Sequence, residues 1–319
     1  MMGARSCSLL TIVALCTLSF ADDPGKKQTQ RTIVARVNGQ PIYASEVRYE
    51  LNQALKGKQL NPQMLALAQA RMREQLVDRQ LVMTYLARTK QAASEQDVEF
   101  ALEQLVKKLK AREQSLTDHL KSLGIAEDEL RRELAWKLSW QKYLERYLTA
   151  ENLQKHFAKH RRQFDGTQLR VAHILLKADV KDTTAVEAVT KQAAEIRQKI
   201  EAGELTFAAA AGKFSQGPSA AKGGDIGLIE RLQPMPEAFS QAAFGLEPGG
   251  ISSPVVTTIG MHLIRCLEIK PGQKTWQDVA PELQVAVTQY LFRWIADKER
   301  VTAKVELVDS KSKEPGKQE

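Results

Sequence analysis

The sequence predicts an α+β protein in which a helical N-terminal domain is completed by the C-terminal helix and strand, with a second domain inserted between them. Three observations predict this arrangement. The 319 residues are too many for one small core. Aromatic residues are few and Ala, Leu, Gln and Lys are abundant, a composition that favours helix. Short apolar runs within residues 169–270 are bounded by turn-forming residues, as buried strands are.

Residues 1–21 are predicted to be a secretory signal peptide. A charged start and an apolar run precede Ser19-Phe-Ala21, which fits the small-x-small cleavage rule. The apolar run is too short to span a bilayer comfortably, so we expect an exported chain with no integral membrane segment after cleavage. Lipidation at Cys16 is disfavoured, because Leu15 precedes it where a small residue is expected.

A hairpin and a series of helices are predicted to form the N-terminal domain, residues 22–165. Asn38-Gly39 is a strong hairpin turn signal between strands 32–37 and 40–43. Ser45 is the expected N-cap of a first helix, residues 46–55. The later helices are expected to start at Asn61-Pro62, at the capping box Ser94–Asp97, near Leu116, at Glu127 and after the cap Thr149.

Residues 166–271 are predicted to form the inserted domain, with strands and helices in the order β-α-α-β-α-β-β. The first strand contains Val171-Ala-His173-Ile-Leu-Leu176, and the last begins with Gly260-Met-His262-Leu-Ile264. Thr206 is the expected cap of the second helix. Cys266 shares the strand parity of His262 and is predicted to be core. It is the single cysteine left after signal cleavage, so we expect no internal disulfide.

The C-terminal segment, residues 272–309, is predicted to return to the N-terminal domain. Pro281 is well placed in the first turn of a helix that runs to about Glu299, and a strand at 302–308 follows. This strand needs a partner, and strand 32–37 has none beyond its own hairpin. Residues 310–319 are predicted to be a disordered tail. The expected apolar stripe of the C-terminal helix is Leu283, Val287, Tyr290, Leu291 and Trp294.

Charge and ligand spacing argue against two function classes. The formal charge is +8, but basic residues mix with acidic ones along the helices and no basic-aromatic module occurs, so we expect no nucleic-acid binding. His156 and His160 have a spacing that can share a zinc ion, but there is no obvious third ligand. We therefore expect no metal and no cofactor. No feature of the sequence indicates an oligomeric state.

Several motifs in residues 169–270 occur in an order and spacing that resembles a parvulin-type peptidyl-prolyl cis-trans isomerase domain. The resemblance implies a small antiparallel sheet wrapped by helices. The hairpin and helices before it are similar to those of exported SurA-like and PrsA-like foldases, which implies a chaperone-like domain in the periplasm or cell envelope. Besides the His173 strand, the motifs are Gly223-Gly-Asp-Ile-Gly227, Pro236-Glu-Ala-Phe239 with Ala243-Phe244, Leu246-Glu-Pro-Gly-Gly-Ile251, Ser253-Pro-Val255 and Gly260-Met-His262.

The resemblance also implies a proline-binding site. Met235 and Phe239 are expected to wall a pocket for the prolyl ring, with Ile226 at its edge. His173 and His262 are expected side by side beneath this pocket, joined by hydrogen bonds. Thr257 is their expected hydroxyl partner. A structural role for the histidine pair, holding the sheet together, stays open beside direct proton transfer.

One position departs from the family. Parvulins usually have Cys or Asp two residues after Ser215, close to the substrate carbonyl, and this chain has Gly217 there. Gln216 is expected to approach the carbonyl instead, so Ser215 and Gln216 join the candidate catalytic residues. If the acidic or thiol group is important, we expect low activity.

Two functions follow, and a third is weaker. The first is an exported isomerase that rotates X-Pro bonds in unfolded or extended polypeptides. The second is a holdase chaperone on the same frame, with weak or no isomerase activity. Gly217 favours the second, whereas the histidine pair and the Met235/Phe239 pocket favour the first. The third is an envelope scaffold that only docks a partner.

Overall fold

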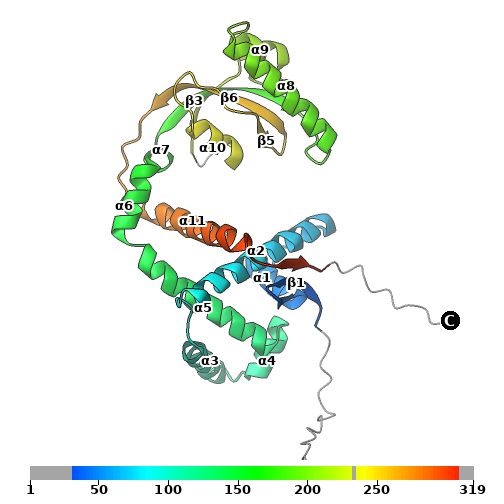
Figure 1. Ribbon diagram of the computed structural model, residues 1–319, viewed down its shortest axis with the longest axis vertical. Coiled ribbons are helices and arrows are strands. Elements are labelled where there is room, and N and C mark those ends of the chain that lie inside the picture. The colour runs from blue at the N-terminus through cyan, green and yellow to red at the C-terminus, as the bar shows by residue number, and fades with distance from the viewer. Residues whose placement is uncertain (1–30, 232–234, 309–319) are drawn as a thin grey trace, which may run out of the picture.

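The computed structural model describes residues 31–231 and 235–308 (Figure 1). The predicted signal peptide and C-terminal tail lie outside the described residues. The N-terminal part contains β1 (Ile33–Val37), β2 (Gln40–Tyr43), α1 (Ala44–Leu55), α2 (Pro62–Arg88), α3 (Glu95–Lys110), α4 (Leu116–Leu123), α5 (Glu127–Tyr147), α6 (Ala150–Lys159) and α7 (Arg161–Phe164). The inserted part contains β3 (Gln168–Lys177), α8 (Thr183–Glu201), α9 (Phe207–Phe214), β4 (Asp225–Glu230), α10 (Glu237–Phe244), β5 (Val255–Thr257) and β6 (Gly260–Lys270), and the C-terminal part contains α11 (Ala280–Arg300) and β7 (Val305–Leu307).

A three-stranded antiparallel sheet joins the two ends of the described chain. Its strand order is β2-β1-β7, so β7 pairs with β1 although the inserted part separates them in sequence. The hairpin turns at Asn38 and Gly39, whose φ angles are 50° and 82°, as the turn signal predicts. The side-chain oxygen of Asn38 also accepts a hydrogen bond from the Lys304 amide at 2.9 Å. The C-terminal strand therefore completes the N-terminal sheet, which confirms the predicted α+β fold.

Helix α11 packs against α6 and then against α2 (Figure 1). Leu283 and Val287 lie in a core shared with α6, whereas Ile295 lies in a core shared with α2. The predicted stripe is wrong at Tyr290 and Trp294, whose exposed fractions are 57% and 42%. The buried face of α11 shifts around the helix where its packing partner changes, and a single sequence stripe does not include that shift.

The inserted domain is a four-stranded antiparallel sheet of order β4-β3-β6-β5, covered by helices on both faces. Ala172, Ile174 and Leu176 of β3 pack with α8 and α9. Alternate residues of β3 and β6 point to the other face, where they pack against α10. In Figure 1, α10 lies on the side of the sheet nearer α11, and α8 and α9 lie on the opposite side. Cys266 is fully buried on the α10 face, as its strand parity predicts.

The chain crosses between the domains twice, near Asp165 and near Gly272, and hydrogen bonds hold these two crossings together. The Asp165 carboxylate accepts from the Thr167 amide at 2.9 Å and its hydroxyl at 2.6 Å, and the Asp165 carbonyl accepts from the Lys274 amide at 2.9 Å. A Cβ at Gly272 would lie 2.0 Å from the Asp165 carbonyl oxygen, so only glycine allows the two crossings to approach this closely. Arg162 donates to the Leu246 carbonyl at 2.9 Å, which links α7 to the inserted domain.

Most predicted helix starts are confirmed, but the first is wrong. Helix α1 begins at Ala44, so Ser45 lies inside the helix and is not its cap. The Glu46 carboxylate instead accepts from the Tyr43 amide at 2.8 Å, and the Ser45 hydroxyl donates to Glu129 of α5 at 2.5 Å. The predicted caps whose side chains accept hydrogen bonds from their helices are Asn61, Ser94, Thr149 and Thr206.

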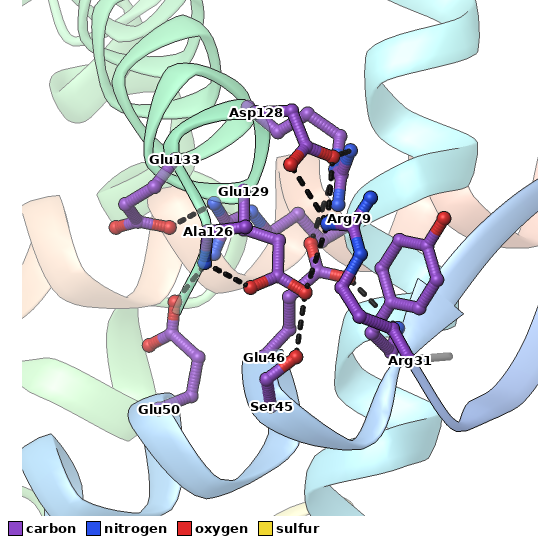
Figure 2. Close-up of polar contacts among 11 residues, drawn as sticks. Arg31, Ser45, Glu46, Glu50, Arg79, Ala126, Asp128, Glu129 and Glu133 are labelled. Carbon is purple, nitrogen blue, oxygen red and sulfur yellow. Dashed lines mark hydrogen bonds and ion pairs between the residues drawn. The ribbon is translucent and has the colours of Figure 1, made fainter. Parts of the chain in front are cut away.

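A partly buried ionic network holds α1, α2 and α5 together. Figure 2 shows Arg79 of α2 directed toward Glu50 of α1 and Glu133 of α5, and the structure pairs it with both. The exposed fractions of these side chains are 16% for Arg79, 23% for Glu50 and 8% for Glu133. Burial, followed by the nearby Glu133, raises the pKa of Glu50 above its ordinary value. Lys137 also pairs with Glu133, at 3.0 Å, but Arg79 is the cation that contacts both carboxylates.

Replacing Arg79 tests this network. We expect Arg79→Gln to lower the free energy of unfolding by about 3 kcal/mol, because it leaves two poorly solvated carboxylates without their shared cation. The control is Arg131→Gln on α5, whose side chain is 37% exposed and pairs with Glu99. That change should cost less than about 1 kcal/mol. Urea unfolding followed by tryptophan fluorescence measures both, and equal losses would contradict the assignment.

Candidate active site

The two histidines predicted from the sequence meet on the α10 face of the sheet. His173 on β3 and His262 on the neighbouring β6 stack with ring centroids 5.4 Å apart and an interplanar angle of 17°. Their Nδ1 atoms lie 3.2 Å apart, within hydrogen-bond distance. The exposed fractions are 6% for His173 and 1% for His262. Each ring therefore has a fixed orientation and a buried polar partner.

Thr257 and Phe239 complete the surroundings of the pair. Thr257, at the end of β5, places its hydroxyl 2.8 Å from His262 Nε2. The Phe239 ring meets both imidazoles edge to face, with centroids 5.7 Å from His173 and 5.3 Å from His262. Phe239 is fully buried, so its ring packs against the histidines and is enclosed by the residues around it. The structure thus brings together four of the predicted residues.

Burial makes both histidines harder to protonate. It lowers the pKa of His173 below its ordinary value. Burial, followed by the neighbouring His173, lowers the pKa of His262 to about 4. Both imidazoles are therefore neutral near pH 7, so each ring carries one proton. The pair can exchange hydrogen bonds but does not supply a positive charge.

The loop after α9 runs beside β3 and is fixed to it. The Ser215 hydroxyl accepts hydrogen bonds from the Leu175 amide at 3.1 Å and the Gly217 amide at 3.3 Å. The side-chain oxygen of Gln216 accepts from the Lys177 amide at 2.6 Å. Both predicted residues therefore bind backbone in this structure. An ideal Cβ at Gly217 would lie 3.5 Å from His173 Nε2, so the loop passes directly beside that nitrogen.

Ile226 and Met235, the other two predicted pocket residues, lie on the same face. Both are partly buried and pack against the hydrophobic cluster that contains Phe239 and Ile264. Partial exposure leaves part of each side chain available to a ligand. The structure therefore brings the predicted pocket residues and the histidine pair to one face of one sheet.

Gly224 positions His173, and the sequence reasoning did not assign it that role. The His173 amide donates to the Gly224 carbonyl at 2.9 Å, where β4 approaches β3. Gly224 has a φ of 84°, and a Cβ there would lie 2.5 Å from the His173 carbonyl oxygen. Only glycine permits this approach. The signal was present as two consecutive glycines before a strand, but the neighbour that makes the glycine necessary is remote in sequence.

His156 lies on α6 and His160 is the C-cap residue of that helix, with ring centroids 4.5 Å apart. Within residues 31–231 and 235–308, no group of three or more His, Cys, Asp or Glu side chains is arranged to hold a metal ion. Among those same residues, no helix is both long and apolar enough to cross a membrane.

Two families match this chain. Residues 173–268 match the PPIC-type PPIase domain, and residues 2–144 match the SurA-like N-terminal domain. A chaperone SurA from Polaromonas sp. is 38% identical over 112 residues, which are 35% of this chain and 23% of that protein. Foldase protein PrsA 4 from Bacillus cereus is 27% identical over 210 residues, which are 64% of this chain and 66% of the foldase. The chain thus spans less than two thirds of the length of these relatives.

Solved structures are similar to different shares of the chain. A peptidylprolyl isomerase, PrsA from Bacillus anthracis, is 21% identical, with a TM-score of 0.36 over 72% of this chain and 95% of that one. A PpiC-type peptidyl-prolyl cis-trans isomerase domain is 26% identical and covers 34% of this chain, with a TM-score of 0.31.

The low pKa of His262 predicts an acid-sensitive inserted domain. Because the folded-state pKa is about 4 and an unfolded histidine titrates near 6.5, the unfolded chain binds more protons between these values. The stability contributed by the neutral ring is complete above about pH 6.5, and about 3 kcal/mol of it is lost as the pH falls to about 4. Amide hydrogen exchange of β3 and β6 measures this loss. His262→Gln should flatten the pH dependence, and an unchanged slope would contradict the assignment.

Proposed function

We propose that this chain is an exported isomerase that assists protein folding, because residues 173–268 match the PPIC-type PPIase domain and residues 2–144 match the SurA-like N-terminal domain. Its substrates are unfolded or extended polypeptides of secreted or envelope proteins that contain X-Pro bonds. The observation that carries the proposal is the neutral His173/His262 pair, locked by Thr257 and packed against Phe239 beside partly exposed apolar side chains.

The chemistry requires a pocket and a few oriented polar groups. Rotation about a peptide bond is opposed by a barrier of about 18–20 kcal/mol, because the planar amide is stabilised by resonance. The transition state is a twisted amide that has lost this resonance. An enzyme therefore accelerates the rotation by holding the prolyl ring in a dry pocket and by binding the twisted amide more strongly than the planar one.

The residues divide into three roles. Ile226 and Met235 line the prolyl pocket, and the buried Phe239 ring supports it from behind, packed against the histidines. His173, His262 and Thr257 provide the polar groups beneath the amide. Ser215 and Gln216 act as positioning residues, since their side chains tie the loop to β3.

A second function, holdase activity of the N-terminal domain, is favoured by one surface feature. Helices α3 and α5 form the sides of a groove of about 740 Å³. Phe100, at the edge of this groove, is 62% exposed, and Leu105, Leu134 and Leu138 line it. Such a surface suits an apolar segment of an unfolded chain. The two functions are compatible, and export follows from the signal peptide predicted at residues 1–21.

A protease-free refolding assay tests the isomerase. The chain from Asp22 onward should accelerate the refolding of a proline-limited protein, and Met235→Ala should lower kcat/KM at least about tenfold, because a wall of the pocket is lost. The matched control is Met64→Ala, which truncates a 55% exposed methionine on α2 and should leave the rate unchanged.

The outcomes separate the two functions. No acceleration, with aggregation of an unfolded client still suppressed, would leave a chaperone on a parvulin frame. Suppression that is lost in Phe100→Ala but kept in Met235→Ala would assign the holdase activity to the α3–α5 groove. A chain that neither accelerates refolding nor suppresses aggregation would contradict both proposals.

A further inference from the structure

Nothing in the local backbone requires a glycine at position 217. Its φ lies outside the left-handed region, and an ideal Cβ there would meet three atoms at ordinary van der Waals distance. These atoms are His173 Nε2, Leu175 Cβ and Ser215 Oγ, each at 3.5 Å. A methyl group would therefore fit without strain. The effect of Gly217 is to leave the space beside His173 Nε2 unfilled by the loop.

The hydrogen bonds around the pair are compatible with a proton on that nitrogen. The Thr257 oxygen accepts from the Ile259 amide at 3.3 Å, and it lies 2.8 Å from His262 Nε2 but 3.5 Å from the Gly260 carbonyl. The shorter contact fits a hydroxyl that donates to His262 Nε2, which then accepts. In that arrangement His262 carries its own proton on Nδ1 and donates it to His173 Nδ1, 3.2 Å away. The proton of neutral His173 is consequently on Nε2.

We infer that His173 Nε2–H, uncovered by Gly217, donates a hydrogen bond to the prolyl nitrogen of the substrate as the amide twists. This inference rests on the proposed isomerase function and names the group that takes the place of the family's Asp or Cys side chain. Within residues 31–231 and 235–308, His173 Nε2 has no hydrogen-bond partner. His173 is 6% exposed, and its Nε2–H is a donor that no group of the described residues uses.

The direction of this hydrogen bond suits catalysis. In a planar amide the nitrogen lone pair is delocalised into the carbonyl, so the nitrogen is a poor acceptor. Twisting returns the lone pair to nitrogen. A donor aimed there binds the transition state more strongly than the ground state, which is the condition for raising kcat. The reaction needs no covalent step, and the proton stays on the imidazole throughout.

The chain of bonds from Thr257 keeps this donor in place. Thr257 fixes His262, and His262 fixes His173, so Nε2 carries the proton in a defined direction. On the other side, Ser215 and Gln216 hold the Gly217 backbone against β3, which keeps the space open. Burial disfavours protonation of either ring, so both rings stay neutral near pH 7.

Filling the space with a methyl group is the first test. Gly217→Ala places its Cβ beside Nε2 at contact distance and should lower kcat at least tenfold, with little change in KM and in melting temperature. The matched control is Gly212→Ala on α9, where an added Cβ meets only the Ala220 carbonyl, at 4.0 Å. That variant should keep the full rate. A Gly217→Ala chain as active as the parent would overturn the inference.

The second test observes the nitrogen itself. The chain contains five histidines, so selective ¹⁵N-histidine labelling of the chain from Asp22 onward gives a simple imidazole spectrum. The probe is an Ala-Ala-Pro-Phe peptide. We expect free His173 to be the Nε2–H tautomer, and we expect peptide binding to shift this resonance in the parent chain but much less in Gly217→Ala.

The results separate this inference from the proposed function. Peptide binding and isomerisation without a shift at His173 Nε2, or a free His173 protonated on Nδ1, would overturn the inference and leave the isomerase intact. A parent chain that isomerises no X-Pro peptide would overturn the proposed function itself. Reduced kcat in Gly217→Ala together with the Nε2 shift would support both.

Discussion

The pairing of β7 with β1 is the contact on which the arrangement of the two domains depends. Ala35 lies opposite Leu307, at nearly the other end of the described chain. The pairing fixes α11 against α2 and forces residues 168–270 to leave and re-enter the N-terminal domain as an insertion. The inserted sheet makes all its strand pairs within its own sequence, whereas the N-terminal sheet needs both ends of the chain. Contacts so remote in sequence form slowly, because a long loop must close first.

The crossings determine which way the candidate site faces. Asp165, Thr167 and Gly272 hold the outgoing and returning segments against each other, and Arg162 binds the carbonyl of Leu246. Helices α8 and α9 cover one face of the inserted sheet, so the histidine pair lies on the face with α10, which is nearer α11 in Figure 1. The same few buried polar contacts that join the domains therefore direct the candidate site toward the helical domain.

The features that local chemistry determines were predictable from the sequence. The Asn38-Gly39 turn, the caps and the strand parity of Cys266 all depend on neighbours within a few residues or on side-chain alternation. The errors occurred where a remote contact overrides a local preference. Serine is a residue type that often caps helices, but the Ser45 hydroxyl binds Glu129. The Glu46 carboxylate instead accepts the hydrogen bond from the Tyr43 amide at the start of the helix. Trp294 fits the apolar period of α11 but lies where the packing partner changes.

For the candidate site, sequence reasoning identified residues but not the bonds between them. That His173 and His262 lie together follows from motif order, whereas the contact between their Nδ1 atoms depends on the register of β3 and β6. The register also decides that Ser215 binds the Leu175 amide, a contact between segments that are remote in sequence. Two neutral rings joined by one hydrogen bond between their Nδ1 atoms have only two proton arrangements, and in the one that we infer Thr257 donates to His262 Nε2. The chemistry of the site is therefore a property of three hydrogen bonds that no single motif contains, and in the inferred arrangement one hydroxyl at the end of β5 determines which nitrogen of His173 carries the proton.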